Sequence, residues 1–217
     1  MLKQILYSND NKPLKILCLG AHSDDIEIGA GGAILRLIDA YPVESVYWLT
    51  FCSNNVRKKE AENSAEQFLN PLKKKYININ SFRDGFLPYV GTEAKELFEK
   101  VKSEYTPDLI FTHYRNDLHQ DHRIVNELTW NTFRNHFILE YEIPKYDGDL
   151  HQPNFFIHLN QKYVARKIDI ILASFASQTN KHWFDKESFQ AIMRIRGIES
   201  AAQNKFAEAF YARKIVI

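Results

Sequence analysis

The sequence has little that would point to a membrane, an export signal or a disulfide framework. It contains two cysteines, Cys18 and Cys52, each within an apolar run, so we expect two buried, reduced thiols. No apolar run approaches the length that crosses a bilayer, and the N-terminal stretch MLKQILYSNDNKP lacks the apolar core of a signal peptide. These absences predict a cytoplasmic protein without a membrane span.

An excess of charge of either sign is also missing. Lys and Arg total 28 and Asp and Glu total 27, which gives a net charge of +1. This balance argues against nucleic acid or an anionic membrane as a partner, although a local patch could still bind an anionic ligand. The 217 residues, 45% of them hydrophobic, are typical of a folded globular protein, and we expect one domain over 1–217.

Stretches with the composition of strands alternate with amphipathic stretches along the chain. The expected strands are 15–20, 45–51, 76–80, 108–113, 154–159 and 212–217, and the expected helices are 31–40, 56–69, 92–105, 120–134, 164–175 and 188–203. Residues 137–153 are expected to form a long loop with an embedded strand. The alternation predicts an α/β fold, a Rossmann-like three-layer sandwich whose mostly parallel sheet carries helices on both faces.

Glycine is scarce, with eight in all, yet three of them fall together at 29, 31 and 32. A dinucleotide-binding loop would need G-x-G-x-x-G directly after the first strand and an acidic residue near the end of the second. Here His-Ser-Asp-Asp intervenes, and the second strand ends in Thr50-Phe51-Cys52. We therefore expect these glycines to let a helix pack closely against the sheet.

Histidine and aspartate gather behind the first and the fourth expected strand. Residues 21–32 read AHSDDIEIGAGG and residues 113–122 read HYRNDLHQDH. Because ligands of parallel sheets bind beyond the carboxyl ends of the strands, both clusters are expected at one edge. Imidazole and carboxylate are good zinc ligands, and a catalytic zinc needs about three of them with one open position. A lone His or Asp-Asp is more often a hydrogen-bonding residue or a helix cap, but two clusters at one edge favour a metal site.

These residues resemble the motifs of the PIG-L/LmbE-like zinc-dependent de-N-acetylases. AHSDDIEIGAGG is similar to the AHPDDxE…GG motif of that family, and HYRNDLHQDH is similar to its HxDH motif. The resemblance extends to the RxxE-like segment 57–60, the Asp84-Gly85 turn, the Ser177-Gln178 pair and the AEAF segment 207–210. Two positions depart from the family pattern: Ser23 replaces its usual proline, and Phe175 stands where many members have His.

The resemblance implies a hydrolase that removes an acetyl group from an N-acetylglucosamine-type sugar, its small-molecule partner. It implies Zn²⁺ as the cofactor, with other divalent ions left open, bound by His22, Asp25 and His122. Asp24 matches the general base, and His119 matches a residue that stabilises the oxyanion or assists proton transfer. Asp121 is expected to orient a neighbouring imidazole.

Substrate contacts are harder to assign from the sequence. Arg57, Asp84 and Arg115 are the candidate substrate-binding residues, and Arg57, Arg83 or Arg115 could hold a phosphate or carboxylate unless they are surface or ion-pair residues. Tyr114, Tyr141 and Tyr146 are candidates for lining a sugar pocket. A non-catalytic metal-dependent sugar-binding subunit, a mononuclear hydrolase of a non-sugar amide and a phosphoesterase stay open as alternatives, as does the oligomeric state.

Overall fold

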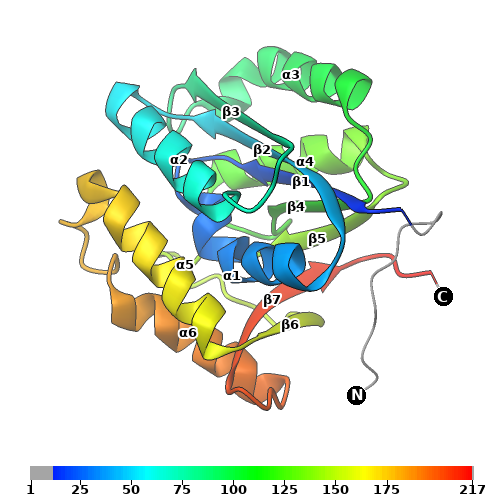
Figure 1. The fold of residues 1–217 in the computed structure, drawn as a ribbon. Helices are drawn as coiled ribbons and strands as arrows, with labels where there is room; N and C mark the ends of the chain where they lie inside the picture. The colour runs from blue at the N-terminus through cyan, green and yellow to red at the C-terminus, as the bar shows by residue number, and fades with distance from the viewer. Residues whose placement is uncertain (1–11, 217) are drawn as a thin grey trace.

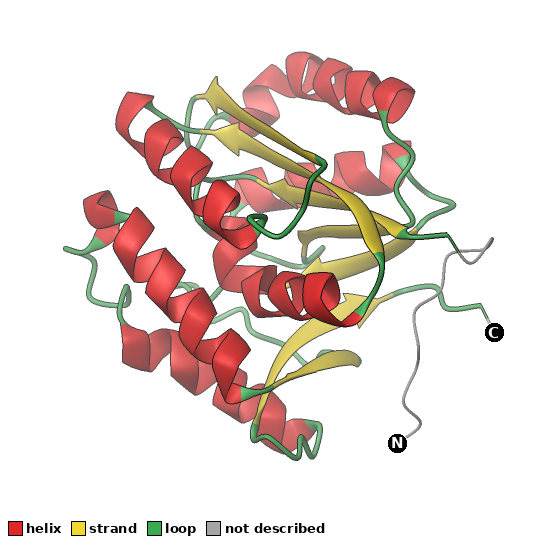
Figure 2. Ribbon diagram, viewed as in Figure 1, coloured by secondary structure: helices red, strands yellow, loops and turns green. Residues whose placement is uncertain are grey.

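A seven-stranded sheet in the order β3-β2-β1-β4-β5-β7-β6 forms the centre of the computed structural model, which describes residues 12–216 (Figures 1 and 2). Strands β1 to β5 run parallel to one another, whereas β7 is antiparallel to both β5 and β6. The strands are β1 Leu14–Gly20, β2 Val43–Cys52, β3 Lys75–Phe82, β4 Leu109–His113, β5 Phe137–Tyr141, β6 Phe155–Leu159 and β7 Phe206–Ala212. The expected mostly parallel sheet is therefore confirmed, with an antiparallel addition at one edge.

Helices cover both faces of this sheet. They are α1 Asp25–Ala40, α2 Asn55–Phe68, α3 Gly91–Glu104, α4 Gln120–Thr132, α5 Gln161–Ser174 and α6 Lys186–Glu199, with short 3₁₀ turns η1 Leu87–Val90 and η2 Ala176–Gln178. One apolar core lies between the sheet and helices α1, α2, α5 and α6, and a second lies between the sheet and helices α3 and α4. This arrangement confirms the three-layer α/β architecture.

Strand β1 shows why the sequence produces two cores. Ile16 and Cys18 join one core, while Leu17 and Leu19 join the other, because successive side chains of a strand point to opposite faces. A strand buried on both faces reads as a continuous apolar run, as KILCLG does. Strand β1 lies between β2 and β4, where the strand order reverses direction. The loops that follow β1 and β4 therefore meet at the switch point where α/β sheets bind their ligands.

Two elements, α1 and β7, differ most from their expected boundaries. Helix α1 begins at Asp25 rather than at residue 31, and the N–H of Ile28 already donates to the carbonyl of Asp24 at 3.0 Å. The glycines of this segment have low helix propensity, but the acidic Asp25 and Glu27 in the first turn favour a helix N-terminus. The last strand covers Phe206–Ala212 rather than 212–217. The strand is buried throughout, but the charged Glu208 in it interrupts the apolar pattern that is typical of a buried strand. Residue 217 lies outside the described residues.

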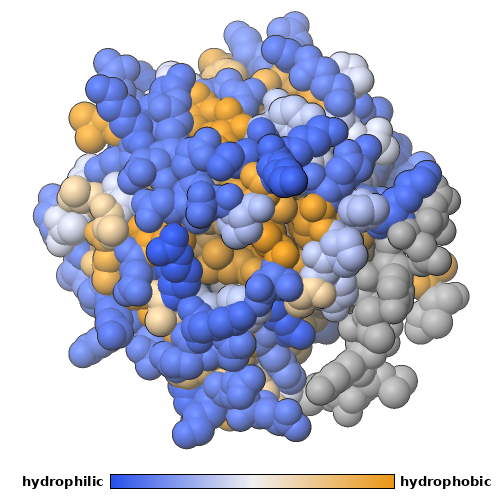
Figure 3. Space-filling view, viewed as in Figure 1, coloured by the Kyte–Doolittle hydropathy of each residue, from blue (hydrophilic) through white to orange (hydrophobic). Residues whose placement is uncertain are grey.

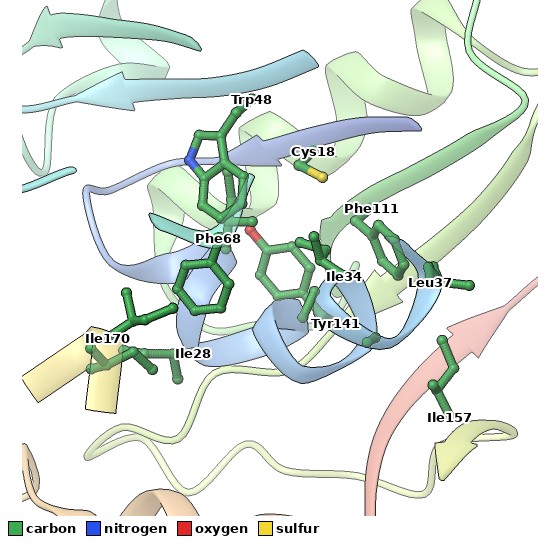
Figure 4. Packing of buried hydrophobic residues seen from close by; sticks show 14 of the residues in the cluster. Cys18, Ile28, Ile34, Leu37, Trp48, Phe68, Phe111, Tyr141, Ile157 and Ile170 are labelled. Atoms are coloured by element: carbon green, nitrogen blue, oxygen red, sulfur yellow. The ribbon is translucent and has the colours of Figure 1, made fainter. Parts of the chain in front are cut away.

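Helix α1 lies unusually close to the sheet at Gly29. A Cβ atom there would come within 2.1 Å of the ring of Tyr141, so only glycine allows this approach. The Tyr141 ring lies in the core among Ile34, Phe68 and Phe111 (Figure 4), and its hydroxyl donates to the carbonyl of Leu19 at 2.7 Å. The expected close packing is confirmed, whereas the expectation that Tyr141 lines a sugar pocket is wrong because its side chain is fully buried.

The surface of the protein seen in Figure 3 is largely polar, and both cysteines are buried. Polar side chains cover most of the face drawn in Figure 3, and apolar residues show mainly near its centre. Within residues 12–216, no helix combines the length and the apolar character that crossing a bilayer requires. Cys18 and Cys52 are buried free thiols, as expected.

Substitution of Gly29 by alanine is expected to destabilise the protein by about 1–3 kcal/mol, because the new methyl group overlaps the Tyr141 ring. Urea unfolding followed by circular dichroism measures the effect. Gly91→Ala is the matched control, since its Cβ would meet nothing within 4 Å and its φ of −61° is helical. Equal stability of the two variants would contradict the close approach of α1 to Tyr141.

Candidate metal-dependent active site

Three side chains from the loops behind β1 and β4 converge at the switch point. His22 lies in the loop after β1, Asp25 is the first residue of α1, and His122 lies in the first turn of α4. The distances are 3.1 Å from His22 Nδ1 to His122 Nε2, 3.2 Å from His22 Nδ1 to Asp25 Oδ2, and 3.5 Å from His122 Nε2 to Asp25 Oδ2. Ligands of a tetrahedral zinc, at bonds of about 2.0–2.1 Å, are roughly 3.3 Å apart. The three atoms therefore have the spacing of a ligand set.

The protonation states of these groups also suit a cation. Burial and the neighbouring His113 lower the pKa of His122 to about 3, so its imidazole is neutral. Burial opposes ionisation of Asp25, but His122, His22 and His113 hold the pKa of its carboxyl well below the usual value. Burial would lower the pKa of His22, yet Asp25, Asp121 and Asp84 raise it well above the usual value. His22 therefore holds a proton at the place where a divalent ion would bind, and binding of the ion would release that proton. The three residues fit such an ion.

His113, for which the sequence indicates no role, lies behind this group. Its Nε2 is 3.2 Å from Asp25 Oδ2, and its ring stacks on His122 with centroids 3.9 Å apart. Nε2 of His113 also accepts the N–H of Ala21 at 2.9 Å, which occupies its lone pair. His113 is fully buried, so it packs behind Asp25 and His122 rather than reaching the open side of the site. Its place as the last residue of the DLIFTH strand was the only signal in the sequence.

His122 is held from its other side by a buried chain of charges. Its Nδ1 lies 2.9 Å from Asp117 Oδ2, and the ammonium of Lys145 lies 2.8 Å from the same oxygen. Lys145 also pairs with Asp149 at 2.6 Å, and Asp149 accepts the N–H of Leu118 at 2.8 Å. Burial would raise the pKa of Asp117, but the contacts with His122 and Lys145 lower it, so the carboxylate stays ionised. A carboxylate on the far nitrogen fixes the orientation of a ligating imidazole.

Asp121 orients His22. Its Oδ2 lies 3.2 Å from His22 Nε2 and accepts the N–H of Gly85 at 2.7 Å, while Oδ1 accepts the N–H of Leu87 at 3.1 Å. The Asp84 Oδ1 lies 3.1 Å from the same nitrogen of His22, and this contact lowers the pKa of Asp84 to about 2. The Asp84 side chain is 66% exposed, so it lies at the rim of the site and can still contact a ligand.

Asp24, the expected base, is buried beside Arg57. Its Oδ1 lies 2.6 Å from Nη2 of Arg57, at the start of α2, where the side chain of Asn54 caps the helix. Burial raises the pKa of Asp24, although Arg57 opposes this. A surface groove of about 540 Å³ lies next to Arg57, and Arg57 Nε and Gln178 Oε1 are buried there without a hydrogen-bond partner among the described residues. The lining residues are Asn54, Asn55, Val56, Arg57, Ser177 and Gln178.

His119 caps the N-terminus of α4 and faces His22 edge-on, with ring centroids 4.8 Å apart. Its Nδ1 accepts the N–H of Asp121 at 3.2 Å. Burial and the nearby His22 lower the pKa of His119, so the ring is neutral near pH 7. Because Nδ1 is an acceptor, the one proton is carried by Nε2, which is then the donor that His119 offers.

Other residues expected near a substrate take separate positions. Arg115 is exposed on the loop after β4, and its backbone N–H donates to Glu140 Oε2 at 3.0 Å. The guanidinium of Arg83 lies 3.6 Å from the ring centroid of Phe86. Tyr114 stacks on Tyr211, and Tyr146 is exposed against His182. The structure thus gathers Arg57 and Asp84 at the site, but not Arg115.

A family model described as PIG-L, GlcNAc-PI de-N-acetylase, matches residues 17–133 and so spans both clusters. The chain belongs to the PIG-L family. All of the candidate ligands and Asp24, Asp121 and His119 lie within the matched segment.

Solved structures share the fold of this PIG-L family chain over nearly its whole length. The conserved protein TT1542 of Thermus thermophilus matches with a TM-score of 0.74 and 20% identity, covering 94% of this chain and 96% of its own. N,N'-diacetylchitobiose deacetylase of Pyrococcus horikoshii matches with a TM-score of 0.67 and 23% identity, over 91% and 83%. The 4-carboxy-2-hydroxymuconate hydratase GalB of Pseudomonas putida KT2440 matches with a TM-score of 0.68 and 14% identity, over 94% and 98%. At these identities the likeness establishes the fold alone.

Asp117→Asn is expected to weaken zinc binding by about 10- to 100-fold, because the amide lacks the negative charge that polarises and orients the neutral imidazole of His122. Competition with a chromophoric chelator measures the affinity. Asp147→Asn, an exposed change in the segment that carries Lys145 and Asp149, is the control and should bind zinc like the wild type. Unchanged affinity in Asp117→Asn would exclude this carboxylate from the support of the site.

Proposed function

We propose that this PIG-L family chain is a metal-dependent hydrolase that removes the acetyl group from an N-acetylated sugar. The carrying observation is the convergence of His22, Asp25 and His122 beside two groups, Asp24 and His119, that cation binding alone does not require. The family match to a de-N-acetylase supports the same reaction. A sugar-binding subunit without catalysis would need neither the buried Asp24–Arg57 pair nor the imidazole of His119.

The cation would be held by His22, Asp25 and His122, with Asp117 and Asp121 orienting the two imidazoles. We propose Zn²⁺, because two imidazoles and one carboxylate with an open fourth position match its catalytic sites. When bound, such an ion supplies Lewis acidity, which polarises a carbonyl and lowers the pKa of water from about 15.7 to roughly 7.

Asp24 and His119 have different roles in the proposed reaction. Asp24 takes a proton from the water that attacks the amide carbon, and its raised pKa makes it a better base than an ordinary carboxylate. Arg57 holds the Asp24 carboxylate in place at 2.6 Å. The Nε2–H of His119 donates a hydrogen bond to the carbonyl oxygen as negative charge develops there. Asp24, which has taken the proton from water, then returns it to the leaving amine.

The substrate class is an N-acetylglucosamine-type conjugate. The groove beside Arg57 is lined by Asn54, Asn55, Val56, Arg57, Ser177 and Gln178. The side-chain amides of the exposed Asn54 and Asn55 are available to a hydroxylated ligand. Asp84 contributes a further acceptor at the rim. The diacetylchitobiose deacetylase of Pyrococcus horikoshii, which shares the fold, supports a substrate of this kind. Arg115 is proposed only for an outlying, anionic part of a larger substrate.

Asp24→Asn is expected to retain about one zinc ion per chain and to lose about 10²- to 10⁴-fold in kcat, because the base is removed while the ligands stay. His122→Ala is expected to lose the metal as well as turnover. Acetate release from a panel of N-acetylated sugars and nucleotide sugars, with metal content measured on the same samples, tests both variants. Asp147→Asn, which is exposed, serves as the control with wild-type turnover.

The outcomes of this experiment separate the alternatives. Acetate released by the wild type and lost in Asp24→Asn with metal retained supports the deacetylase. Two bound ions per chain with phosphate released from phosphoester substrates would replace it by a phosphoesterase. Bound metal without acetate from any sugar, and with water added to an unsaturated acid instead, would point to a hydratase like the one of related fold.

His119→Ala is expected to lower kcat by about 10²- to 10³-fold with little change in zinc content, because it removes the donor to the developing oxyanion. The loss should be similar at all pH values between about 7 and 8, since a neutral imidazole already carries the donated proton. Steady-state kinetics across this pH range, with zinc quantified, give the answer. A loss that disappears at high pH would show instead that a protonated His119 is required.

A further inference from the structure

An ion pair of Lys167 and Glu208 is buried between helix α1, helix α5 and strand β7. The Lys167 ammonium lies 2.6 Å from Glu208 Oε1, and the two side chains are 1% and 4% exposed. Lys167 comes from α5, Glu208 comes from β7, and both elements contact α1 (Figure 1). Neither residue has a part in the site described above, although Glu208 belongs to the AEAF segment of the family resemblance.

Both partners form hydrogen bonds with backbone groups of α1 between Ile28 and Ala33. Lys167 Nζ donates to the carbonyl of Ile28 at 2.6 Å. Glu208 accepts the N–H of Gly32 on Oε1 at 2.9 Å and the N–H of Ala33 on Oε2 at 2.6 Å. In a regular α-helix the N–H of Gly32 would donate to the carbonyl of Ile28. The ion pair thus binds the Ile28 carbonyl and the Gly32 N–H, two backbone groups that are four residues apart in the helix.

Gly32 makes this arrangement sterically feasible. A Cβ atom on Gly32 would lie 2.5 Å from Cδ1 of Leu159 and 3.0 Å from Oε1 of Glu208. Only a residue without a side chain lets the carboxylate approach the helix backbone from this direction. The adjacent hollow has a volume of about 10 Å³, which is room for about one water molecule and not for a ligand. The charges therefore act on α1 and not on a bound molecule.

Burying two charges is costly, and apolar residues of similar volume often stabilise a fold as well or better. A role in stability alone therefore gives a weak reason for charges at this place. The first turn of α1, Asp25–Ile28, carries the candidate ligand Asp25 and directly follows the candidate base Asp24. An anchor on Ile28 from α5 and on Gly32 from β7 sets the position of this first turn against the sheet.

We propose that Lys167 and Glu208 are positioning residues that fix the first turn of α1 so that Asp25 meets His22 and His122. The inference rests on the proposed function of that site. With both charges removed, α1 loses the contacts that bind its backbone at Ile28, Gly32 and Ala33 to α5 and β7. The first turn then shifts relative to β1 and β4, and Asp25 no longer lies at its distances of 3.2 and 3.5 Å from the two imidazoles.

The experiment compares Lys167→Met, Glu208→Leu and the double variant Lys167→Met/Glu208→Leu. Each single variant leaves one buried charge without its partner, so the Tm should fall, whereas the double variant should recover most of the lost Tm. The double variant is nevertheless expected to bind zinc about tenfold or more weakly. The visible absorption bands of bound Co²⁺, used as a probe of ligand geometry, should shift in the same variant.

Matched controls separate positioning from general disruption. Lys162→Met removes an exposed pair with Asp39 that also joins α5 to α1, but at the far end of α1, and should leave zinc affinity and the Co²⁺ bands unchanged. Glu208→Gln keeps the shape of the side chain and loses its charge, so it is a milder variant that should change the same readouts in the same direction. A folded double variant, or a folded Glu208→Gln, with the wild-type zinc affinity and Co²⁺ spectrum would overturn the proposal.

The metal readouts need no substrate, so the two proposals fail in different ways. Wild-type protein that binds Co²⁺ but releases no acetate refutes the proposed reaction and leaves the test of the ion pair intact. With an active substrate, the double variant should lose kcat while KM changes by less than about twofold, because the ground-state contacts in the groove are retained. A change in KM alone would count against a role in placing Asp24 and Asp25.

Discussion

The buried carboxylate of Asp25 is the interaction around which the rest of the site is built. Its Oδ2 lies 2.6 Å from the backbone N of His22 and between 3.2 and 3.5 Å from ring nitrogens of His22, His113 and His122. A buried anion is tolerated only when donors or cations contact it, and for Asp25 these are the backbone N–H and the imidazole of His22. Asp25 therefore couples the loop after β1 to the end of β4 and the start of α4, which come much later in the sequence.

Tyr141 connects the apolar core to the surroundings of the Asp25 carboxylate. The ring of Tyr141 packs on α1 at Gly29, while its hydroxyl lies 2.7 Å from the Leu19 carbonyl and 3.2 Å from His113 Nε2. His113 in turn contacts Asp25 and stacks on His122. Core packing and site geometry are thus connected through a single side chain. Changes that move α1 on the sheet will move Asp25 as well, even where they lie far from the site in sequence.

The sequence predicted the parts of the structure that follow from local patterns. The strand ends at Gly20 and His113 mark the switch point, so the parallel sheet alone predicts that the two clusters meet, whereas the family resemblance was needed to single out His22 and His122. Lys145 could not be foreseen, because it reaches Asp117 from a loop whose residues have no periodicity. Glu208 misled the interpretation of its own strand, since a charge in a buried strand makes sense only with Lys167, which is distant in the sequence. Contacts between loops, and buried charges paired across elements, are set by the tertiary fold.

The fold itself does not determine the reaction, since the same architecture at 14% identity belongs to a hydratase. A cation held by His22, Asp25 and His122 would activate water for either chemistry. The difference lies in where protons must go. Hydrolysis of an amide needs a donor for the developing oxyanion and a proton for the departing amine. A neutral His119 with its proton on Nε2 meets the first need, and a buried Asp24 with a raised pKa meets the second because it holds the proton it has taken until the amine leaves. We therefore propose amide hydrolysis from this pairing taken together with the family match to a de-N-acetylase.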